Sequence, residues 1–232
     1  MTKQRLYLID GTAVAYRAHF AFSMGPSGGL TTKDGRATSA VFGFLMTIKS
    51  LIDRETPDAI AVSFDGPRAD LERTQRFPDY KANREAMPEE LYEQFDTIEK
   101  IVEGFHIPVV KSKGHEADDV LGTLARQGKE AGMEVFMVTG DKDFMQLVDD
   151  DVKMWNLRSS TGDPEIIGPK EVVEKFGVRP DQIIDFLALM GDASDNIPGV
   201  PKVGKKTAAE LLTQFDTLEA ALDRADEVKK PS

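Results

Sequence analysis

The sequence has no cysteine, and it has only three histidines and one tryptophan among 232 residues. The absence of cysteine excludes disulfides, thiolate zinc sites, iron–sulfur clusters and a cysteine nucleophile. The three histidines, His19, His106 and His115, have no spacing typical of metal ligands. A metal site in this chain would therefore use oxygen ligands.

Long hydrophobic runs are missing as well. The unbroken apolar runs, such as residues 59–62, are far too short to span a bilayer. Asp10 interrupts the only apolar stretch near the N-terminus, which argues against a signal peptide. With 41% hydrophobic and 30% charged residues, the composition is typical of a folded protein. We expect an intracellular, cytoplasmic protein with no membrane partner.

The charge is strongly negative. Forty acidic residues face 29 basic ones, and the formal net charge is −11. Averaged over the surface, this excess should repel nucleic acid and favour cations or basic partners. The location of the excess acids therefore decides which ligands the chain suits.

Three short apolar runs have the pattern of buried parallel strands, and each ends at glycine and aspartate: residues 5–9, 59–64 and 134–138. Further strands are expected at residues 107–110 and 152–157. Helical periodicity fills the stretches between them, at residues 12–22, 38–54, 88–105 and 117–131. This alternation predicts an α/β fold with a mostly parallel sheet flanked by helices.

The pattern changes after about residue 168. Short helical stretches punctuated by proline and glycine follow, at residues 169–176, 180–190, 205–215 and 218–225. We therefore expect a catalytic α/β core over residues 1–168 and an all-helical region over residues 169–232.

Acidic residues stand where ligands collect in α/β sheets. Asp10, Asp65 and Asp141 each follow a predicted strand, and the carboxyl ends of parallel strands share one sheet edge. Other acids lie at a helix start or in turns: Glu116, Asp118, Asp119, Asp143, Asp192 and Asp195. Each group alone is also explained by helix capping, the helix dipole or turn chemistry.

Taken together, these nine acids predict a cation site. Converging carboxylates repel each other unless cations neutralise them or some stay protonated. Oxygen-only ligands suit two Mg²⁺ (or Mn²⁺) ions, the arrangement that hydrolyses phosphodiesters. Helical spacing turns Asp118 away from Glu116, so both reach metal only if Glu116 precedes the helix. Which of Glu116, Asp118 and Asp119 are direct ligands stays open.

Two basic stretches could contact nucleic acid. Arg68, Arg73, Arg76, Lys81 and Arg84 follow Asp65 and are interleaved with aromatic residues, as in backbone-gripping and base-stacking segments. The alternative is a solvated surface helix. Residues 196–207 form a second, acid-free stretch with glycines and lysines before a helix, a pattern that can hold phosphate without reading sequence.

Five motifs run in order along the chain: LIDG at 8–11, FPDYKANR at 77–84, GHEADD at 114–119, TGDKD at 139–143 and GDASDNIPGV at 191–200. With them the chain closely resembles the 5′-nuclease (5′→3′ exonuclease) domain at the N-terminus of bacterial DNA polymerase I, in the flap endonuclease superfamily. The resemblance covers about residues 4 to 225. It implies a PIN-like core, a helical arch over about residues 66–100 and a helix–hairpin–helix-type motif at about 190–212.

The resemblance implies a structure-specific 5′-nuclease, both exonuclease and flap endonuclease, that acts in replication and repair. Its partners would be DNA with a 5′ flap, nick or overhang, and RNA primers. We expect a monomer at the nucleoid in the cytoplasm. The hairpin would also bind K⁺ through its carbonyls, although Lys202 stands where the family often has glycine.

The resemblance also distributes roles among residues. One metal would be held by Asp10, Asp65, Glu116, Asp118 and Asp119, and the second by Asp141, Asp143, Asp192 and Asp195. Lys81, Arg84 and Arg17 would engage phosphate, and Tyr80 would stack a base. The remaining DNA contacts would come from Arg73, Arg76, Gly199, Lys202, Gly204, Lys205, Lys206 and Thr207.

Alternatives stay open at this point. A non-catalytic module could bind DNA structure with the hairpin alone. Asp10-Gly11-Thr12 suggests an aspartyl-phosphate phosphatase weakly, because that chemistry needs an aspartate where Thr12 stands. The sequence stops at Ser232 without a polymerase domain, so it is either a piece of a polymerase or a stand-alone relative. Without the nine site acids, 31 acidic residues face 29 basic ones, so the net charge no longer argues against nucleic acid.

Overall fold

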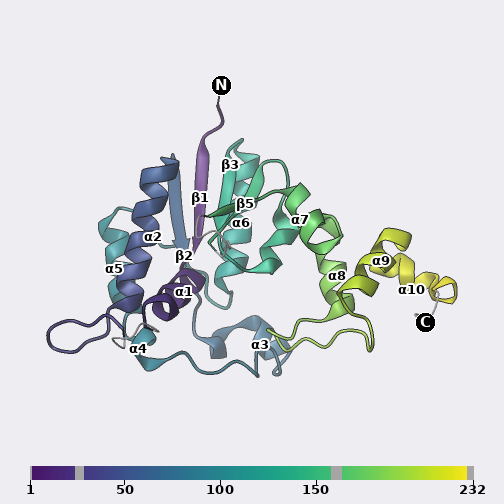
Figure 1. Cartoon of the computed structure of the whole chain (residues 1–232), viewed down its shortest axis with the longest axis horizontal. Helices are drawn as coiled ribbons and strands as arrows, with labels where there is room; N and C mark the ends of the chain where they lie inside the picture. Colours follow the sequence, from purple (N-terminus) through teal and green to yellow (C-terminus); the bar gives the residue numbers. More distant parts are fainter. Residues whose placement is uncertain (1, 24–28, 158–163, 229–232) are drawn as a thin grey trace.

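A five-stranded sheet forms the centre of the α/β part in the computed structural model, which describes residues 2–23, 29–157 and 164–228 (Figure 1). The strands are β1 (Arg5–Asp10), β2 (Ala59–Ser63), β3 (Glu134–Val138), β4 (Val152–Asn156) and β5 (Glu165–Ile167), in the order β2-β1-β3-β4-β5. The first four are parallel, and β5 runs antiparallel to β4. The predicted mostly parallel sheet is confirmed.

Helices cover both faces of this sheet, which explains why its strands are apolar throughout rather than alternating. On one face, Tyr7 and Ile9 pack with α1 (Gly11–Ser23), α2 (Ser39–Glu55) and α5 (Phe95–Gly104). On the other face, Leu8 and Met137 pack with α6 (Ala117–Glu130). The carboxyl ends of β1 and β2 are in register, with Asp10 beside Ser63.

Two local predictions differ from the structure. Residues 107–110 form no strand: Val62 and Val109 make only an isolated parallel bridge, and Pro108 has no N–H for a ladder. The helix predicted over 88–105 is two helices, α4 (Glu89–Tyr92) and α5. Buried Gln94 separates them, and its Oε1 accepts hydrogen bonds from the N–H groups of Ala40 and Val41 at the start of α2.

Short helices and turns make up the segment between β2 and α4. A 3-10 turn at Arg68–Asp70 and α3 (Glu72–Arg76) are its regular elements. Figure 1 shows α3 near the loops that lead into α9, and not against the sheet. The region expected to be a helical arch therefore consists of short helices joined by turns.

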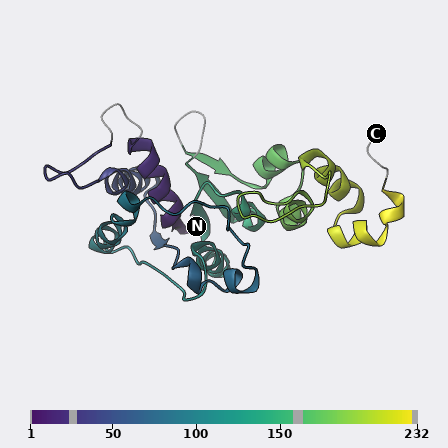
Figure 2. The ribbon, with the colours of Figure 1, turned by 90° about the horizontal axis from the view of Figure 1, so that it is seen from below.

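The C-terminal region is helical, as expected. It contains α7 (Pro169–Phe176), α8 (Ile183–Met190), α9 (Lys205–Phe215) and α10 (Leu218–Asp223). Phe186 and Leu212 belong to the same apolar cluster as Leu8 and Met137, so α8 and α9 are anchored to the α/β core. Figure 2 shows α10 far from the sheet, beyond α9. No helix among the described residues is long and apolar enough to cross a membrane.

Candidate active site

Asp10 lies at the end of β1 and is 8% exposed. Its Oδ1 accepts a hydrogen bond from Ala13 N–H at 2.9 Å, and its Oδ2 accepts one from Thr139 Oγ1 at 2.9 Å. Burial and the neighbouring charges of Asp65 and Asp141 raise the pKa of Asp10 to about 6. Thr139 was not among the predicted site residues, although its position just after β3 placed it at the same sheet edge.

Glu116 precedes α6 as its N-cap residue. This satisfies the condition under which Glu116 and Asp118 both reach the site. Asp119 completes a capping box, because its Oδ2 accepts a hydrogen bond from Glu116 N–H at 3.1 Å. Asp65 meets the same helix end, where its Oδ1 accepts a hydrogen bond from Ala117 N–H at 2.8 Å.

The first group of acids comprises Asp10, Asp65, Glu116, Asp118 and Asp119. Among them, Asp118 has the least favoured charged form. Burial, reinforced by the charge of Glu116, raises the pKa of Asp118 to about 7. Glu116 behaves in the opposite way. Burial alone would raise its pKa, but hydrogen bonds from Lys81, Tyr80 and Arg73 outweigh burial and lower it.

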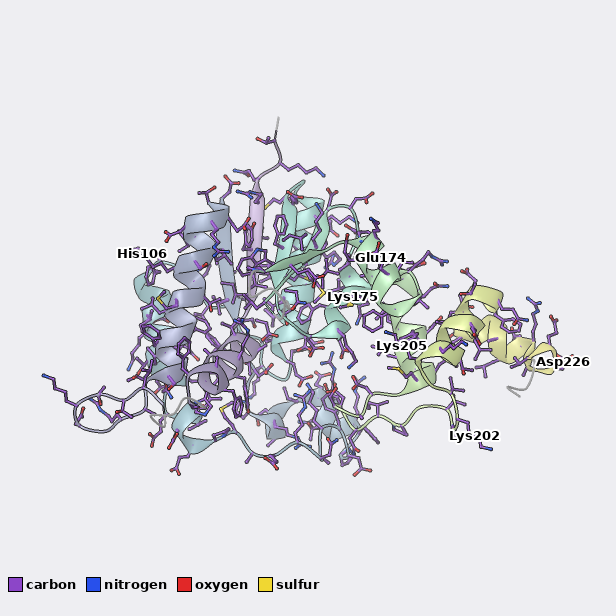
Figure 3. The ribbon with its side chains drawn as sticks, in the orientation of Figure 1. His106, Glu174, Lys175, Lys202, Lys205 and Asp226 are labelled. Atoms are coloured by element: carbon purple, nitrogen blue, oxygen red, sulfur yellow. The ribbon has the colours of Figure 1, made fainter. Side chains whose placement is uncertain are left out.

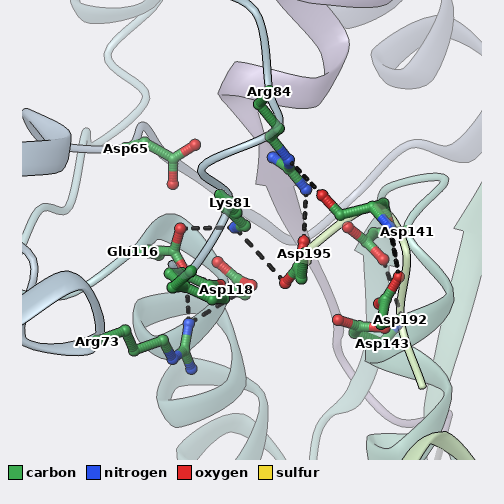
Figure 4. A network of polar contacts seen from close by, with 12 residues as sticks. Asp65, Arg73, Lys81, Arg84, Glu116, Asp118, Asp141, Asp143, Asp192 and Asp195 are labelled. Atoms are coloured by element: carbon green, nitrogen blue, oxygen red, sulfur yellow. Dashed lines mark hydrogen bonds and ion pairs between the residues drawn. The ribbon is translucent and has the colours of Figure 1, made fainter. Parts of the chain in front are cut away.

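A second group of acids lies beside the first. Asp143, Asp192 and Asp195 each offer a carboxylate oxygen within 4.8 Å of the others. Asp141 accepts a hydrogen bond from Asp143 N–H at 3.0 Å and so begins the 3-10 helix Lys142–Leu147. Figure 4 shows Asp141, Asp143, Asp192 and Asp195 gathered together, with Asp65, Glu116 and Asp118 across from them.

Asp143 tests whether this group fits a metal ion. Its Oδ1 is buried and accepts no hydrogen bond among the described residues. Burial and the charge of Asp141 raise the pKa of Asp143 to about 6. A buried oxygen without a hydrogen bond, in a cluster of carboxylates that repel each other, fits a divalent cation with oxygen ligands.

Basic side chains are interleaved with these acids (Figure 4). Lys81 Nζ lies 2.6 Å from Glu116 Oε1 and 3.9 Å from Asp195 Oδ2. Arg84 Nη2 lies 2.7 Å from Asp195 Oδ1. The structure therefore brings the predicted pair Lys81 and Arg84 into contact with carboxylates of both groups.

Two further cations contact the same acids. Arg73, predicted to bind DNA, pairs with Glu116 at 2.5 Å and with Asp119 at 2.6 Å. Lys142 Nζ lies 2.6 Å from Asp192 Oδ2 and 3.6 Å from Asp143 Oδ1. Lys142 was missed, although its place between Asp141 and Asp143 was the signal that could have found it.

Tyr80 and Arg17 occupy different environments. Tyr80 is 7% exposed, and its hydroxyl donates to Glu116 Oε2 at 2.6 Å. Its ring is therefore covered in this structure, whereas base stacking needs an open ring face. Arg17 lies exposed on α1, as a phosphate contact requires.

The hairpin glycines have different environments. Gly191 has a φ of 79°, and a Cβ on Gly199 would lie 2.3 Å from Met190 C. Glycine at 199 therefore permits close packing of the backbone after α8. Gly204 is the N-cap of α9, and a Cβ there would meet nothing within 4 Å.

The hairpin lysines are not equivalent either. Lys202 is exposed and has a φ of 68° (Figure 3). Lys205 Nζ donates to the carbonyl of Lys175 at 2.5 Å and lies 4.9 Å from the centre of the Phe176 ring, so it ties α9 to α7. The Lys206 side chain is 90% exposed, and its Nζ lies 3.8 Å from Glu210 Oε1. Thr207, the next residue, is half-buried. Arg76, in the first basic stretch, is exposed on α3. Lys202, Lys206 and Arg76 are thus exposed cations of the predicted DNA contacts that touch no site acid among the described residues.

A cavity of about 560 Å³ opens beside the acids. Arg73, Tyr80, Asp118, Asp143 and Asp195 contribute to its walls. Acids of both groups thus face one space, whose volume lies in the range of ligand-binding pockets.

The chain is similar in sequence to known DNA polymerases over about a quarter of their length. The chain is 41% identical over 227 residues to DNA polymerase I of Bacillus caldotenax, and 41% identical over 227 residues to that of Mycobacterium tuberculosis. Each match covers 98% of this chain and 25% of the polymerase, so the chain spans about a quarter of the length of these relatives.

Solved structures show the same fold. T5 5′-exonuclease with bound zinc superposes with a TM-score of 0.77 at 24% identity, over 98% of this chain and 82% of that one. Flap endonuclease-1 from Methanococcus jannaschii superposes with a TM-score of 0.63 at 21% identity, over 98% of this chain and 75% of that one. At these identities the structures establish the fold alone.

Family models cover nearly the whole chain. Residues 5–177 match the N-terminal resolvase-like domain of the 5′-3′ exonucleases, and residues 178–232 match their C-terminal SAM fold. The chain therefore belongs to the 5′-3′ exonuclease family.

Proposed function

We propose that this chain is a structure-specific 5′-nuclease that hydrolyses phosphodiesters in DNA with a 5′ flap, nick or overhang, and in RNA primers. One observation carries the proposal: two groups of carboxylates face one cavity, and Lys81 and Arg84 lie between them. Membership in the 5′-3′ exonuclease family supports the reaction class. In this proposal residues 1–168 carry most of the chemistry, and residues 169–232 hold the duplex and contribute Asp192 and Asp195 to the site.

The acids would hold two divalent ions, Mg²⁺ or Mn²⁺. Asp10, Asp65, Glu116, Asp118 and Asp119 would serve one ion, and Asp141, Asp143, Asp192 and Asp195 the other. Two such ions supply an activated water and stabilise the charge of the transition state. The similar T5 structures contain metal ions, one of them together with DNA, which supports this assignment.

The residues of the chain itself would bind and orient the phosphate. Lys81 and Arg84 place positive charge where negative charge develops on the phosphate oxygens. Thr139 fixes one oxygen of Asp10, and Ala117 N–H fixes one oxygen of Asp65, so both carboxylates present defined lone pairs to an ion. Duplex contacts through Lys202, Lys206 and Arg76 would carry no sequence information.

The hairpin would also coordinate K⁺ through backbone carbonyls. Lys202 replaces the glycine frequent in this turn but keeps a left-handed φ of 68°, which glycine also adopts readily. The backbone can therefore follow the course that glycine would allow, at a cost of about 1 kcal/mol. This supports retention of the ion site despite the substitution.

A 5′-flap oligonucleotide tests the proposal against a non-catalytic DNA-binding module. The labelled substrate is incubated with the protein in Mg²⁺ and, separately, in excess chelator. The nuclease predicts products of defined length in Mg²⁺ alone, whereas a binding module predicts a shifted complex and no product in either condition. Product lengths also separate cleavage at the flap junction from stepwise removal of nucleotides.

A further inference from the structure

Two segments far apart in the sequence are held together at the active site. We call residues 79–84 the arch-base segment and residues 192–196 the carboxylate loop. Lys81 N–H donates to the carbonyl of Asp195 at 2.9 Å, and Arg84 Nε donates to the carbonyl of Ser194 at 3.1 Å. The arch-base segment carries the phosphate-binding cations, and the carboxylate loop carries two acids of the second group.

Two asparagines complete this connection from opposite sides. Asn83 Nδ2 donates to the carbonyl of Ala193 at 2.7 Å, and Asn196 Nδ2 donates to the carbonyl of Asp79 at 2.8 Å. Each amide thus reaches from its own segment to the backbone of the other. Neither asparagine contacts a carboxylate in these hydrogen bonds, and neither was among the predicted site residues.

The carboxylate loop is rigid enough to serve as a reference for the arch-base segment. Asp192 and Ile197 exchange two backbone hydrogen bonds of 2.8 Å, and Asp192 Oδ1 accepts from Ser194 N–H at 2.9 Å. At its base, Gly191 and Gly199 pack backbone against backbone. Displacement of the arch-base segment would therefore move Lys81 and Arg84 relative to the acids.

Asn196 is suited to this place by its backbone as well as by its amide. It has a φ of 59°, in the left-handed region that asparagine adopts more readily than most residues. Lys81, across the contact, has a φ of 53°. Both segments therefore hold uncommon backbone conformations where they meet, which tertiary contacts must maintain.

We propose that Asn83 and Asn196 are positioning residues that fix the phosphate-binding cations against the second carboxylate group. This inference rests on the proposed nuclease function. Loss of either amide should leave the fold intact, because each acts on the alignment of the two segments. It should slow cleavage by allowing Lys81 and Arg84 to shift away from the scissile phosphate.

A mutant cycle separates positioning from general destabilisation. Asn83→Ala and Asn196→Gly each remove the amide, and glycine keeps the left-handed backbone at residue 196. In single-turnover cleavage of a 5′-flap substrate in Mg²⁺, we expect each variant to be about 5- to 10-fold slower. In a Lys81→Met/Arg84→Ala background, Asn83→Ala should add less than about twofold, because both cations that it positions are gone. Exposed Glu85→Ala is the control and should stay within about twofold of wild type.

A distance measurement tests the connection without cleavage. Because the chain has no cysteine, spin labels can be placed at Ala82→Cys and Lys170→Cys alone. We expect a narrow distribution of label distances in the wild type and a broader one in the Asn83→Ala/Asn196→Gly double variant. An unchanged distribution, or a full Asn83→Ala effect in the Lys81→Met/Arg84→Ala background, overturns the inference. A wild type that binds DNA but does not cleave it overturns the proposed function instead, while the label distances still test the connection.

Discussion

Lys81 Nζ lies 2.6 Å from Glu116 Oε1, and the two side chains are only 13% and 5% exposed. In the proposed mechanism this lysine would compete with a divalent ion for the Glu116 carboxylate, and it would also supply positive charge to a substrate phosphate. These two roles make opposite predictions for its removal.

Lys81→Met should strengthen divalent-ion binding and weaken catalysis. Loss of the cation frees Glu116 for metal, so we expect Mn²⁺ affinity to rise several-fold in calorimetry. The cleavage rate should fall about 100-fold, because transition-state charge loses a partner. Lys81→Arg keeps the charge and should retain the wild-type Mn²⁺ affinity to within about twofold. Weaker Mn²⁺ binding by Lys81→Met would contradict the assignment.

Metal binding should release protons near pH 6. The pKa of Asp10 and of Asp143 is raised to about 6, and that of Asp118 to about 7. Between about pH 4 and pH 7 the metal-free folded state therefore holds more protons than the unfolded state. The stability that these three acids contribute is present at acid pH and is lost as the pH rises through their folded-state pKa values of about 6 to 7. A bound divalent ion favours the deprotonated acids and reverses this loss.

Calorimetry in buffers of different ionisation enthalpy counts these protons. At about pH 6 the count should be positive, and at about pH 8.5 it should approach zero. Asp143→Asn should lower the count at the acid pH. Equal proton counts at both pH values would show that the buried acids do not titrate in this range.

Two hairpin glycines should respond differently to a methyl group. Gly199→Ala places Cβ 2.3 Å from Met190 C, whereas Gly204→Ala meets nothing within 4 Å. Urea unfolding should show a loss of about 3 kcal/mol or more for Gly199→Ala, and a change of less than about 1 kcal/mol for Gly204→Ala. Similar stability of the two variants would contradict the close backbone packing of Gly199 against Met190 and Gly191.

Neighbouring lysines on α9 should differ in their effect on DNA affinity. Lys206→Ala removes an exposed cation and should reduce the slope of log affinity against log salt by about one. Lys205→Ala removes the tie to Lys175 and Phe176, so it should lower the stability of the α7–α9 contact with little change in this slope. Binding titrations between about 50 and 200 mM salt measure both slopes.

Much of the core was predictable because its strands are buried on both faces. The runs at residues 5–9 and 134–138 match β1 and β3 to within one residue. The short antiparallel β5 was not predicted, since three residues give too little periodicity. The break between α4 and α5 was not predicted either. Gln94 lies at this break, and its side chain accepts a hydrogen bond from Ala40 N–H, more than fifty positions away in the sequence.

The acids of the site were predictable from their places at strand ends and helix starts. Their partners were not. Arg73 appeared to be one of several surface cations, yet it pairs with Glu116 and Asp119. Tyr80 was expected to stack on a base, yet the residue is buried and its hydroxyl donates a hydrogen bond to Glu116. Such pairings depend on how a long irregular segment folds back onto the sheet edge, which no local periodicity records.

The most direct test of the central claim is single-turnover cleavage of a 5′-flap substrate in Mg²⁺ by the Asp141→Ala/Asp143→Ala variant. Thermal unfolding and DNA binding first establish that the variant is folded and still binds the substrate. We predict a rate at least about 10³-fold below wild type, because two of the four proposed ligands of the second ion are lost. Cleavage at the wild-type rate would contradict the assignment of these carboxylates to the catalytic site.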